Sequence, residues 1–369
     1  MLATGSFDAT VGIWRRWDSY GQGGGGGANA EGWGLNNPAS NGGEDDDLTQ
    51  RDEADEDEEE DEEWRFAVLL DGHDSEVKAV SWSPSGMLLA TCSRDKSIWI
   101  WEDLDDGDNN FETVAVMQEH GGDVKCVVWH PVEECLASAS YDDTIRMWRE
   151  DIDDWGQVAC LKGHEGTVWF IDWEGIENVP LPPLSPSSSS LCSTDLATQW
   201  KDQHALSGPR LISCSDDRTI RLWQKEPKEQ QPSGGSGMPS IIRPTGSDEI
   251  WTQETTLPPA HDLSIYAVAW SKRTGRVVSV GADGRIVVYE ERFASGRDEM
   301  DTGADGAASA SPLRTEWNVI ATLDGAHGIY EINHASWAKR AERGREEGKD
   351  EEALVTTADD GSIRVWLLG

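Results

Sequence analysis

Residues 72–101 read GHDSEVKAVSWSPSGMLLATCSRDKSIWIW, and this stretch decides the fold because versions of it return along the whole chain. Each full version has a His near its start, an Asp in a short turn and, in most copies, a Trp at its end. The further copies are QEHGGDVKCVVWHPVEECLASASYDDTIRMW at 118–148, KGHEGTVWFIDW at 162–173 with LISCSDDRTIRLW at 211–223, AHDLSIYAVAW at 260–270 with RVVSVGADGRIVVY at 276–289, GAHGIYEINHASW at 325–337 with ALVTTADDGSIRVW at 353–366, and a partial copy, LATGSFDATVGIW, at 2–14. A fixed repeat of this kind is one supersecondary unit that stacks on its neighbours to bury its apolar side chains.

The order and spacing of His, Asp and Trp are those of the WD40 repeat, in which each unit forms a four-stranded blade of a ring. The His–Asp interval is the same in three copies, from 73 to 95, from 120 to 142 and from 261 to 283. The sequence therefore predicts an all-β WD40 β-propeller with a seven-bladed parent, of which about four complete and two partial blades are present.

The two ends of the chain are expected to be the partial blades. Residue 2 already lies in the second strand of its unit, and only residues 367–369 follow the Trp366 that ends the last copy. The simplest explanation is a chain that lacks its true beginning, and a genuine open or six-bladed ring is the alternative. We expect residues 1–369 to form one propeller domain.

Each repeat is predicted to contain an internal hydrogen-bond network. The His bonds a Ser or Thr hydroxyl, the turn Asp fixes the His, and the Trp covers the network and donates one N–H. The residues are, copy by copy, His73, Thr91, Asp95 and Trp101; His120, Ser138, Asp142 and Trp148; His164, Ser213, Asp217 and Trp223; His261, Ser279 and Asp283, with Tyr289 in place of Trp; and His327, Thr356, Asp360 and Trp366. Five of the eight histidines are thereby assigned structural rather than catalytic roles.

The amino-acid composition argues against several classes of function. The net charge of −39 argues against binding to DNA or RNA, which needs clusters of Lys and Arg. No apolar stretch is long enough for a membrane span, and no secretion signal is visible. The six Cys have no zinc spacing and no C-x-x-C pair, so we expect buried thiols in a reducing compartment and neither a metal nor another cofactor.

Five insertions interrupt the repeats. Residues 18–63 are Gly-rich and then almost entirely acidic, so they are expected to be disordered. The insertion at 174–208 is placed between the first and second strands of its blade, the ones at 225–250 and 291–314 between third and fourth strands, and 339–352 in a short charged loop that is partly helical. None contains a phosphate-binding loop, a nucleophile elbow or a paired metal motif.

The repeats resemble successive blades of one family, the WD40 component of the cytosolic iron-sulfur protein assembly (CIA) machinery, in its fungal members. The specific part is SRDKSIWIWE at 93–102, followed by DVKCVVWHP at 123–131 and SASYDDT at 138–144. The resemblance implies a seven-bladed scaffold of the targeting complex that delivers iron-sulfur clusters to apoproteins in the cytoplasm and nucleus. It implies as partners a DUF59-type subunit, a HEAT-repeat subunit, an iron-hydrogenase-like cluster carrier and apo Fe-S client proteins.

Two other classes of function remain open. A WD40 adaptor of another complex, either a ubiquitin-ligase substrate receptor or a histone-binding propeller, has the same repeats, because the fold alone does not fix function. The acidic stretch would serve a histone-binding protein, although a solvating loop is the simpler interpretation. An enzyme would need titratable groups converging on the central channel, and no carboxylate pair is visible there, so no catalytic residue is assigned.

The partner-binding surface is predicted on the top face, the end of the ring where the turn Asp residues lie. The residue before each turn Asp projects onto this face: Phe7, Arg94, Tyr141, Asp216, Ala282 and Asp359. A second set comes from the start of each first strand: Lys78, Lys125, Trp169 and Tyr266. Arg94, Lys78 and Lys125 would form a basic spot beside Tyr141 and Trp169, and the family resemblance gives Arg94 a functional role. Such a spot suits a peptide with acidic and aromatic side chains.

Overall fold

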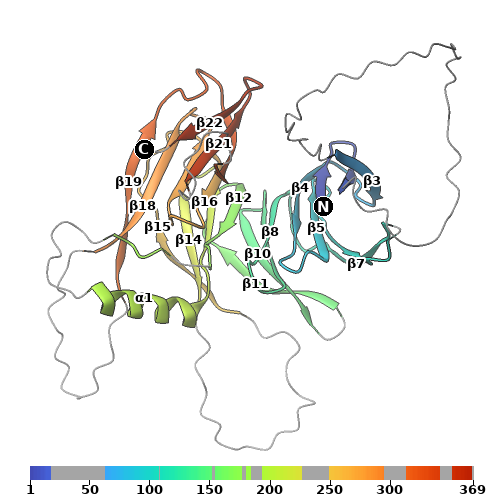
Figure 1. Ribbon diagram of the computed structural model, residues 1–369, viewed down its shortest axis with the longest axis horizontal. Coiled ribbons are helices and arrows are strands. Elements are labelled where there is room, and N and C mark those ends of the chain that lie inside the picture. The colour runs from blue at the N-terminus through green and yellow to red at the C-terminus, as the bar shows by residue number, and fades with distance from the viewer. Residues whose placement is uncertain are drawn as a thin grey trace, which may run out of the picture.

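The computed structural model describes residues 1–17, 63–107, 109–151, 154–176, 180–183, 193–226, 249–294, 313–340 and 351–367. The expected insertions at 18–63, 225–250, 291–314 and 339–352 lie largely outside these residues. The described residues form six antiparallel sheets and one helix. The prediction of an all-β propeller is confirmed, and each sheet is one blade (Figure 1).

The blades follow one another in sequence order, and each is a simple meander. Blade 1 comprises β1 (Leu2–Gly5), β2 (Thr10–Trp17) and β3 (Glu63–Asp71). Blade 2 comprises β4 (Val77–Trp82), β5 (Leu88–Ser93), β6 (Ile98–Asp103) and β7 (Phe111–Met117); blade 3 comprises β8 (Val124–Trp129), β9 (Cys135–Ser140), β10 (Thr144–Asp151) and β11 (Asp154–Lys162). Blade 4 comprises β12 (Val168–Trp173), β13 (Leu211–Ser215), β14 (Ile220–Lys225) and β15 (Trp251–Thr256); blade 5 comprises β16 (Ile265–Trp270), β17 (Val277–Gly281), β18 (Ile286–Phe293) and β19 (Thr315–Leu323); blade 6 comprises β20 (Ile332–Lys339), β21 (Glu352–Ala358) and β22 (Ile363–Leu367).

Small and apolar residues fill the second strand of the inner blades. β9 reads CLASAS, β13 reads LISCS and β17 reads VVSVG, and every residue of the three strands is buried. A strand that is covered on both faces needs no polar alternation, and small side chains let the flanking blades approach closely. Outer strands such as β15 and β19 are mostly exposed, because only one of their faces meets the rest of the protein.

The core is divided among the seams between consecutive blades. Five apolar clusters join blade 1 to 2, 2 to 3, 3 to 4, 4 to 5 and 5 to 6. Within the part of the chain that the structure describes, no such cluster joins blade 6 to blade 1. Figure 1 shows the result, an open arc that runs from blade 1 in blue to blade 6 in red.

The sequence predicts a seven-bladed parent of which about four complete and two partial blades are present, and the described residues form six blades. Four sheets have four strands, and the first and last sheets have three. The edge strands at the two ends of the arc, β1 and β22, are largely exposed, with Leu2, Ile363 and Val365 facing solvent. The repeats predict the type of blade correctly. They do not reveal how many blades a closed ring would contain.

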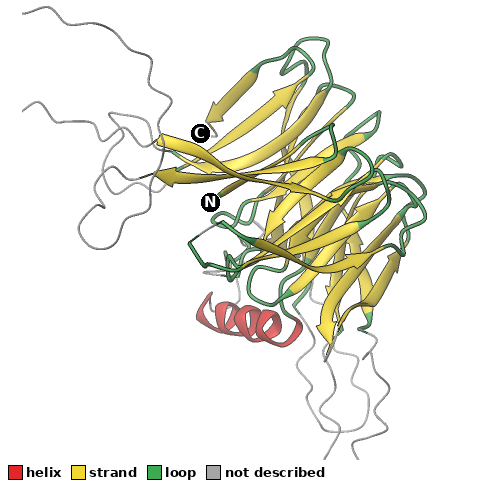
Figure 2. Ribbon diagram, turned by 90° about the vertical axis from the view of Figure 1, so that its right-hand side faces the viewer, coloured by secondary structure: helices red, strands yellow, loops and turns green. Residues whose placement is uncertain are grey.

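The two ends of the blades differ in the length of their connections. Turns between second and third strands, and links from one blade to the next, are short in every blade. The long connections join first to second or third to fourth strands, and so leave from the opposite end. Helix α1 (Ser193–Ser207) lies in one of them, between β12 and β13, a helix that the sequence analysis did not predict in this insertion. Figure 2 shows α1 at one end of the strands and the short turns at the other.

Candidate protein-binding face

The top face is held in shape by the hydrogen-bond network of each repeat. In blade 2, His73 Nδ1 lies 2.9 Å from Asp95 Oδ2, and His73 Nε2 lies 2.8 Å from Thr91 Oγ1. Trp101 Nε1–H donates to the same hydroxyl at 3.0 Å. The corresponding His–Asp and His–hydroxyl distances in blades 3 to 6 lie between 2.7 and 3.0 Å. The structure therefore brings together the predicted residues of all five networks.

Two of the networks contain a histidine whose pKa is lowered. Burial lowers the pKa of His73 and of His164, although the paired Asp residues oppose the shift. Burial by itself would raise the pKa of Asp142, but hydrogen bonds from His120 and Thr144 bring it well below its usual range. A neutral ring that donates from Nδ1 to a carboxylate and accepts at Nε2 from a hydroxyl satisfies every polar atom of the network. These histidines are thus engaged in holding turns.

A second set of bonds positions the residue before each turn Asp. Its backbone N–H donates to the carbonyl that precedes the first strand of the same blade, as in the 3.1 Å bond from Arg94 N to Glu76 O. The equivalent donors are Tyr141, Asp216, Ala282 and Asp359, with distances from 2.9 to 3.1 Å. The five side chains consequently occupy equivalent places at the top face, beside the start of the first strand.

The second residue of each first strand reaches the top face through a β-bulge. The register of the pairing between first and second strands shifts at this residue in blades 2 to 6. The residues at the shift are Lys78, Lys125, Trp169, Tyr266 and Asn333. A bulge leaves its extra residue out of the ladder and re-aims its side chain. The prediction that four of these side chains share a face therefore has a backbone cause, which sequence reasoning missed.

Several of these side chains form a continuous row across blades 3 to 6. Lys125 Nζ lies 5.7 Å from the ring centre of Tyr141 and 4.9 Å from that of Trp169. The ring centres of Trp169 and Tyr266 are 5.3 Å apart, and Tyr266 donates a 2.9 Å hydrogen bond to Glu331. A cation held over two aromatic faces is a preorganised recognition element. The row joins three of the expected site residues to Lys125.

The remaining two predicted cations have partners of their own. Arg94 Nη1 lies 3.0 Å from Glu76 Oε1, and its side chain is largely exposed. Lys78 Nζ lies 4.5 Å from the ring centre of Phe7, on blade 1. Lys125 also pairs with Asp123, at 3.1 Å. The predicted basic spot is therefore a set of three separately supported cations, of which Lys125 is the one seen against Tyr141 and Trp169.

Sequence reasoning missed a buried ionic cluster at the opposite end of blades 4 and 5. The guanidinium of Arg210 is fully buried and binds both oxygens of Glu174, at 2.7 and 3.0 Å, and of Glu291, at 2.7 and 2.8 Å. Trp270 covers it on one side, and Trp200 of α1 covers it as well, with ring centres 5.2 and 5.6 Å away. The cluster thereby fastens α1 to the two blades.

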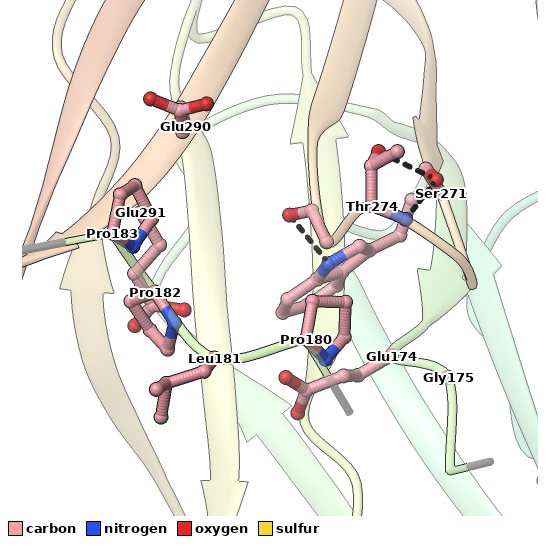
Figure 3. A pocket seen from close by; sticks show the side chains of 12 residues that line it. Glu174, Gly175, Pro180, Leu181, Pro182, Pro183, Ser271, Thr274, Glu290 and Glu291 are labelled. Atoms are coloured by element: carbon pink, nitrogen blue, oxygen red, sulfur yellow. Dashed lines mark hydrogen bonds between the residues drawn. The ribbon is translucent and has the colours of Figure 1, made fainter. Parts of the chain in front are cut away.

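A small pocket lies beside this cluster. Figure 3 shows the chain from Pro180 to Pro183 running along it, with Glu290 and Glu291 at one side and Ser271 and Thr274 at the other. Its volume of about 40 Å³ has room for water rather than for a substrate. Its carboxylates already have Arg partners, since Glu290 binds Arg276 and Arg292.

The described residues contain neither a group of side chains suited to a metal ion nor a helix suited to a membrane. No group of three or more His, Cys, Asp or Glu side chains among them is arranged to hold a metal ion. Burial raises the pKa of Cys126 and Cys135 to about 12, so these thiols stay protonated and are poor ligands. Of the helices described, none is long and apolar enough to cross a membrane.

Comparisons with known proteins agree with the repeat pattern. The family model "WD domain, G-beta repeat" matches residues 64–102, 111–149, 155–224 and 251–290. The chain is 66% identical over 376 residues to a protein of Aspergillus flavus named "Probable cytosolic iron-sulfur protein assembly protein 1", a match that covers 100% of this chain and 82% of that protein. Proteins with the same name in Neosartorya fischeri and Penicillium rubens are 70% and 64% identical over 403 and 384 residues, covering all of this chain and 82% and 83% of theirs.

Proposed function

This chain belongs to the WD40-repeat family and, within it, to the fungal proteins named cytosolic iron-sulfur protein assembly protein 1, and from that premise we propose that it is a scaffold subunit of the complex that targets iron-sulfur clusters to apoproteins. Its role is to bind proteins and not to catalyse a reaction. The partners would be a DUF59-type subunit, a HEAT-repeat subunit, an iron-hydrogenase-like cluster carrier and apo Fe-S clients. We place it in the cytosol, as the relatives' printed names indicate for those proteins.

The observation that carries this proposal is the row of side chains at the top face. Lys125 lies against Tyr141 and Trp169, on a face where all connections are short and well fixed. Aromatic and cationic side chains on a rigid support are the usual anchors of protein interfaces, because they bury much area at a low cost in conformational entropy. Arg94, Lys125 and Tyr266 already have partners within this chain, so their side chains are held in place before a ligand arrives.

A partner with acidic and aromatic side chains fits the Lys78, Arg94, Lys125, Tyr141 and Trp169 part of the face. A carboxylate can approach Arg94 and Lys125 while an aromatic ring packs on Tyr141, which is exposed. Each cation already contacts at least one carboxylate or ring of this chain, so a ligand would add to or replace such a contact. Recognition of a short peptide, such as an acidic carboxyl terminus, is of this kind.

The test is a charge reversal on the top face with a matched reversal on the other end. Arg94→Glu should weaken binding of the recombinant DUF59-type and HEAT-repeat subunits by roughly 1–3 kcal/mol, since it removes a cation and repels an acidic ligand. Lys201→Glu, on the exposed side of α1, should leave that binding unchanged. Melting temperatures of both variants should match the parent, because neither residue belongs to a buried network.

Cells that carry only the Arg94→Glu protein should also incorporate less labelled iron into a cytosolic iron-sulfur protein than cells with Lys201→Glu. Normal partner binding by folded Arg94→Glu protein would show that the top-face site is wrong. A parent protein that binds neither subunit would instead contradict the scaffold role and favour an adaptor of another complex.

A further inference from the structure

The short link that leads into the first strand of a blade carries different side chains in the two halves of the arc. Between the network His and the first strand, blades 2, 3 and 4 have the small residues Ser75, Gly122 and Gly166. A Cβ on Gly122 would lie 3.1 Å from the backbone nitrogen of Asp142, and one on Gly166 would lie 3.0 Å from the Cβ of Asp216. A small residue is therefore what this position accommodates when the link packs against the neighbouring turn.

Blades 5 and 6 have large apolar residues at this position. Blade 5 has Leu263, and blade 6 has a link that is longer by one residue and carries Ile329 and Tyr330. The three residues are 52%, 94% and 47% exposed. Single exposed apolar residues are common on proteins, but a group of three on adjacent links is the kind of patch that marks an interaction site.

One turn brings the two links together. The turn at 281–284 receives a hydrogen bond at Gly284 O from Ala326 N, at 3.3 Å, and Tyr330 O approaches the Cα of Gly284 so closely that a Cβ there would lie 3.1 Å away. On its other side, Ala282 N donates to Ser264 O at 2.9 Å, next to Leu263. The two links that carry the apolar residues thus flank a single turn, and we call Leu263, Ile329 and Tyr330 the apolar rim.

Carboxylates that have only neutral partners adjoin the apolar rim. Glu331, which follows Tyr330, accepts from Tyr266 at 2.9 Å, and Asp359 accepts from Asn333 at 2.6 Å. Glu331 O also accepts the backbone N–H of Asp359, so the two acidic residues are neighbours. Burial and then the charges of Glu331, Asp216 and Asp359 raise the pKa of Tyr266 to about 12, which shows how these negative groups converge. Neither Glu331 nor Asp359 has a Lys or Arg partner among the residues that the structure describes.

Resting on the scaffold role proposed above, we propose that the apolar rim and its adjoining carboxylates bind a protein segment that combines a large apolar side chain with Lys or Arg. The apolar side chain would cover Ile329 and Leu263, and the cation would meet Glu331 and Asp359. The complementary charge argues for this occupant, because an acidic segment would be repelled from two carboxylates whose partners are neutral. The opposite half of the face, with Lys125 and Arg94, selects acidic ligands, so the two halves take different segments.

Site-specific photocrosslinking of the full-length protein tests the occupant. A photoreactive phenylalanine analogue at position 329, in cells, should crosslink a protein segment that has a net positive charge and at least one large apolar residue. The same analogue at position 206 is the control, because Leu206 is 74% exposed on α1, at the other end of the blades. The crosslinked segment is then identified by mass spectrometry. Crosslinks at 329 that are no stronger than those at 206, or that join a net negative segment, overturn the proposal.

A synthetic peptide with the sequence of the crosslinked segment supplies affinities. Ile329→Ser should weaken its binding at least about tenfold, since a buried aliphatic side chain is lost. Asp359→Asn should weaken binding several-fold and flatten its dependence on salt, whereas Leu206→Ser should change nothing. Equal affinities for Ile329→Ser and Leu206→Ser overturn the proposal.

The two proposals fail in different ways. If the DUF59-type and HEAT-repeat subunits bind the parent protein and Arg94→Glu weakens them, a neutral Ile329→Ser result contradicts only the apolar rim. If neither subunit binds the parent protein, the scaffold role is contradicted whatever the crosslinks show. Because Ile329 projects into solvent, Ile329→Ser should keep the parent melting temperature, so its effect on binding can be measured in folded protein.

Discussion

Replacing Arg210 with Met should destabilise the protein far more than removing an exposed cation. The substitution keeps an apolar chain of similar length between Trp200 and Trp270 but leaves Glu174 and Glu291 buried without their counter-ion. Breaking a buried ion pair by removing one partner costs about 3–5 kcal/mol. The direction of the Glu174 pKa agrees with this: burial would raise the pKa, yet Arg210 and His204 bring it from 4.5 to about 2.

The loss should depend on pH with a definite sign. In the parent, the lowered pKa of Glu174 stabilises the fold fully above its unfolded value of 4.5, and this contribution disappears as the pH falls towards 2. In Arg210→Met the Glu174 carboxyl stays buried and loses the guanidinium, with only His204 and the backbone N–H of residue 210 left beside it, so its folded pKa rises and protonation relieves the variant. The difference in unfolding free energy between parent and variant should therefore be largest at pH 7 and should shrink through pH 5 and below.

Urea unfolding followed by tryptophan fluorescence at pH 7 and pH 5 measures both effects. Arg285→Met is the matched control, since Arg285 bridges Asp262 and Asp324, which are both exposed, and its loss should destabilise the protein much less than the loss of Arg210. Adding Glu174→Gln and Glu291→Gln to Arg210→Met should recover part of the stability. A variant no less stable than Arg285→Met, or a loss that is the same at both pH values, would refute the argument.

Three further predictions concern other parts of the chain. Asp95→Ala should lower the free energy of unfolding by roughly 1–3 kcal/mol, measured by thermal or urea unfolding, because His73 loses the hydrogen-bond partner that fixes it. An unchanged unfolding midpoint would show that the network does not stabilise the fold. Deleting residues 24–62 should leave the melting temperature and partner binding almost unchanged, because the remaining loop still closes the β2–β3 hairpin; a large drop in either would show that the segment is structural or an interface. Purified protein should contain no stoichiometric iron, zinc or flavin by elemental analysis and absorbance; iron near one cluster per chain that is lost on mutating Cys92 would contradict this.

The sequence predicts those features that are local and repeated. Asp95 lies two residues before Ser97 and binds its backbone N–H and its hydroxyl. The same arrangement returns with Thr144, Thr219 and Ser362, so an arrangement recognised in one repeat predicts the others. The top-face residues could be placed for the same reason.

Features that occur once could not be predicted. Arg210 and Glu291 form an ion pair although 81 residues separate them in the sequence, and no sequence pattern around either residue predicts the contact. Helix α1 had a weak signal, since Leu196, Trp200 and His204 recur every four residues and all three are buried. The Pro- and Ser-rich sequence before the helix concealed that period. Exposure of Ile329 could not be foreseen either, because an apolar residue in a link predicts burial as readily as it predicts a contact with a partner.

Because the long connections all leave from one end of the blades, labels placed at the two ends can report how the propeller is oriented in an assembly. A fluorescent protein placed between β2 and β3 leaves from the open end of a hairpin that is paired up to Trp17 and Glu63. A second dye at residue 218, in the short turn between β13 and β14, would sit on the other end. Energy transfer from each label to a labelled subunit would then tell which way the propeller points within an assembly, without any change to the residues that hold the assembly together.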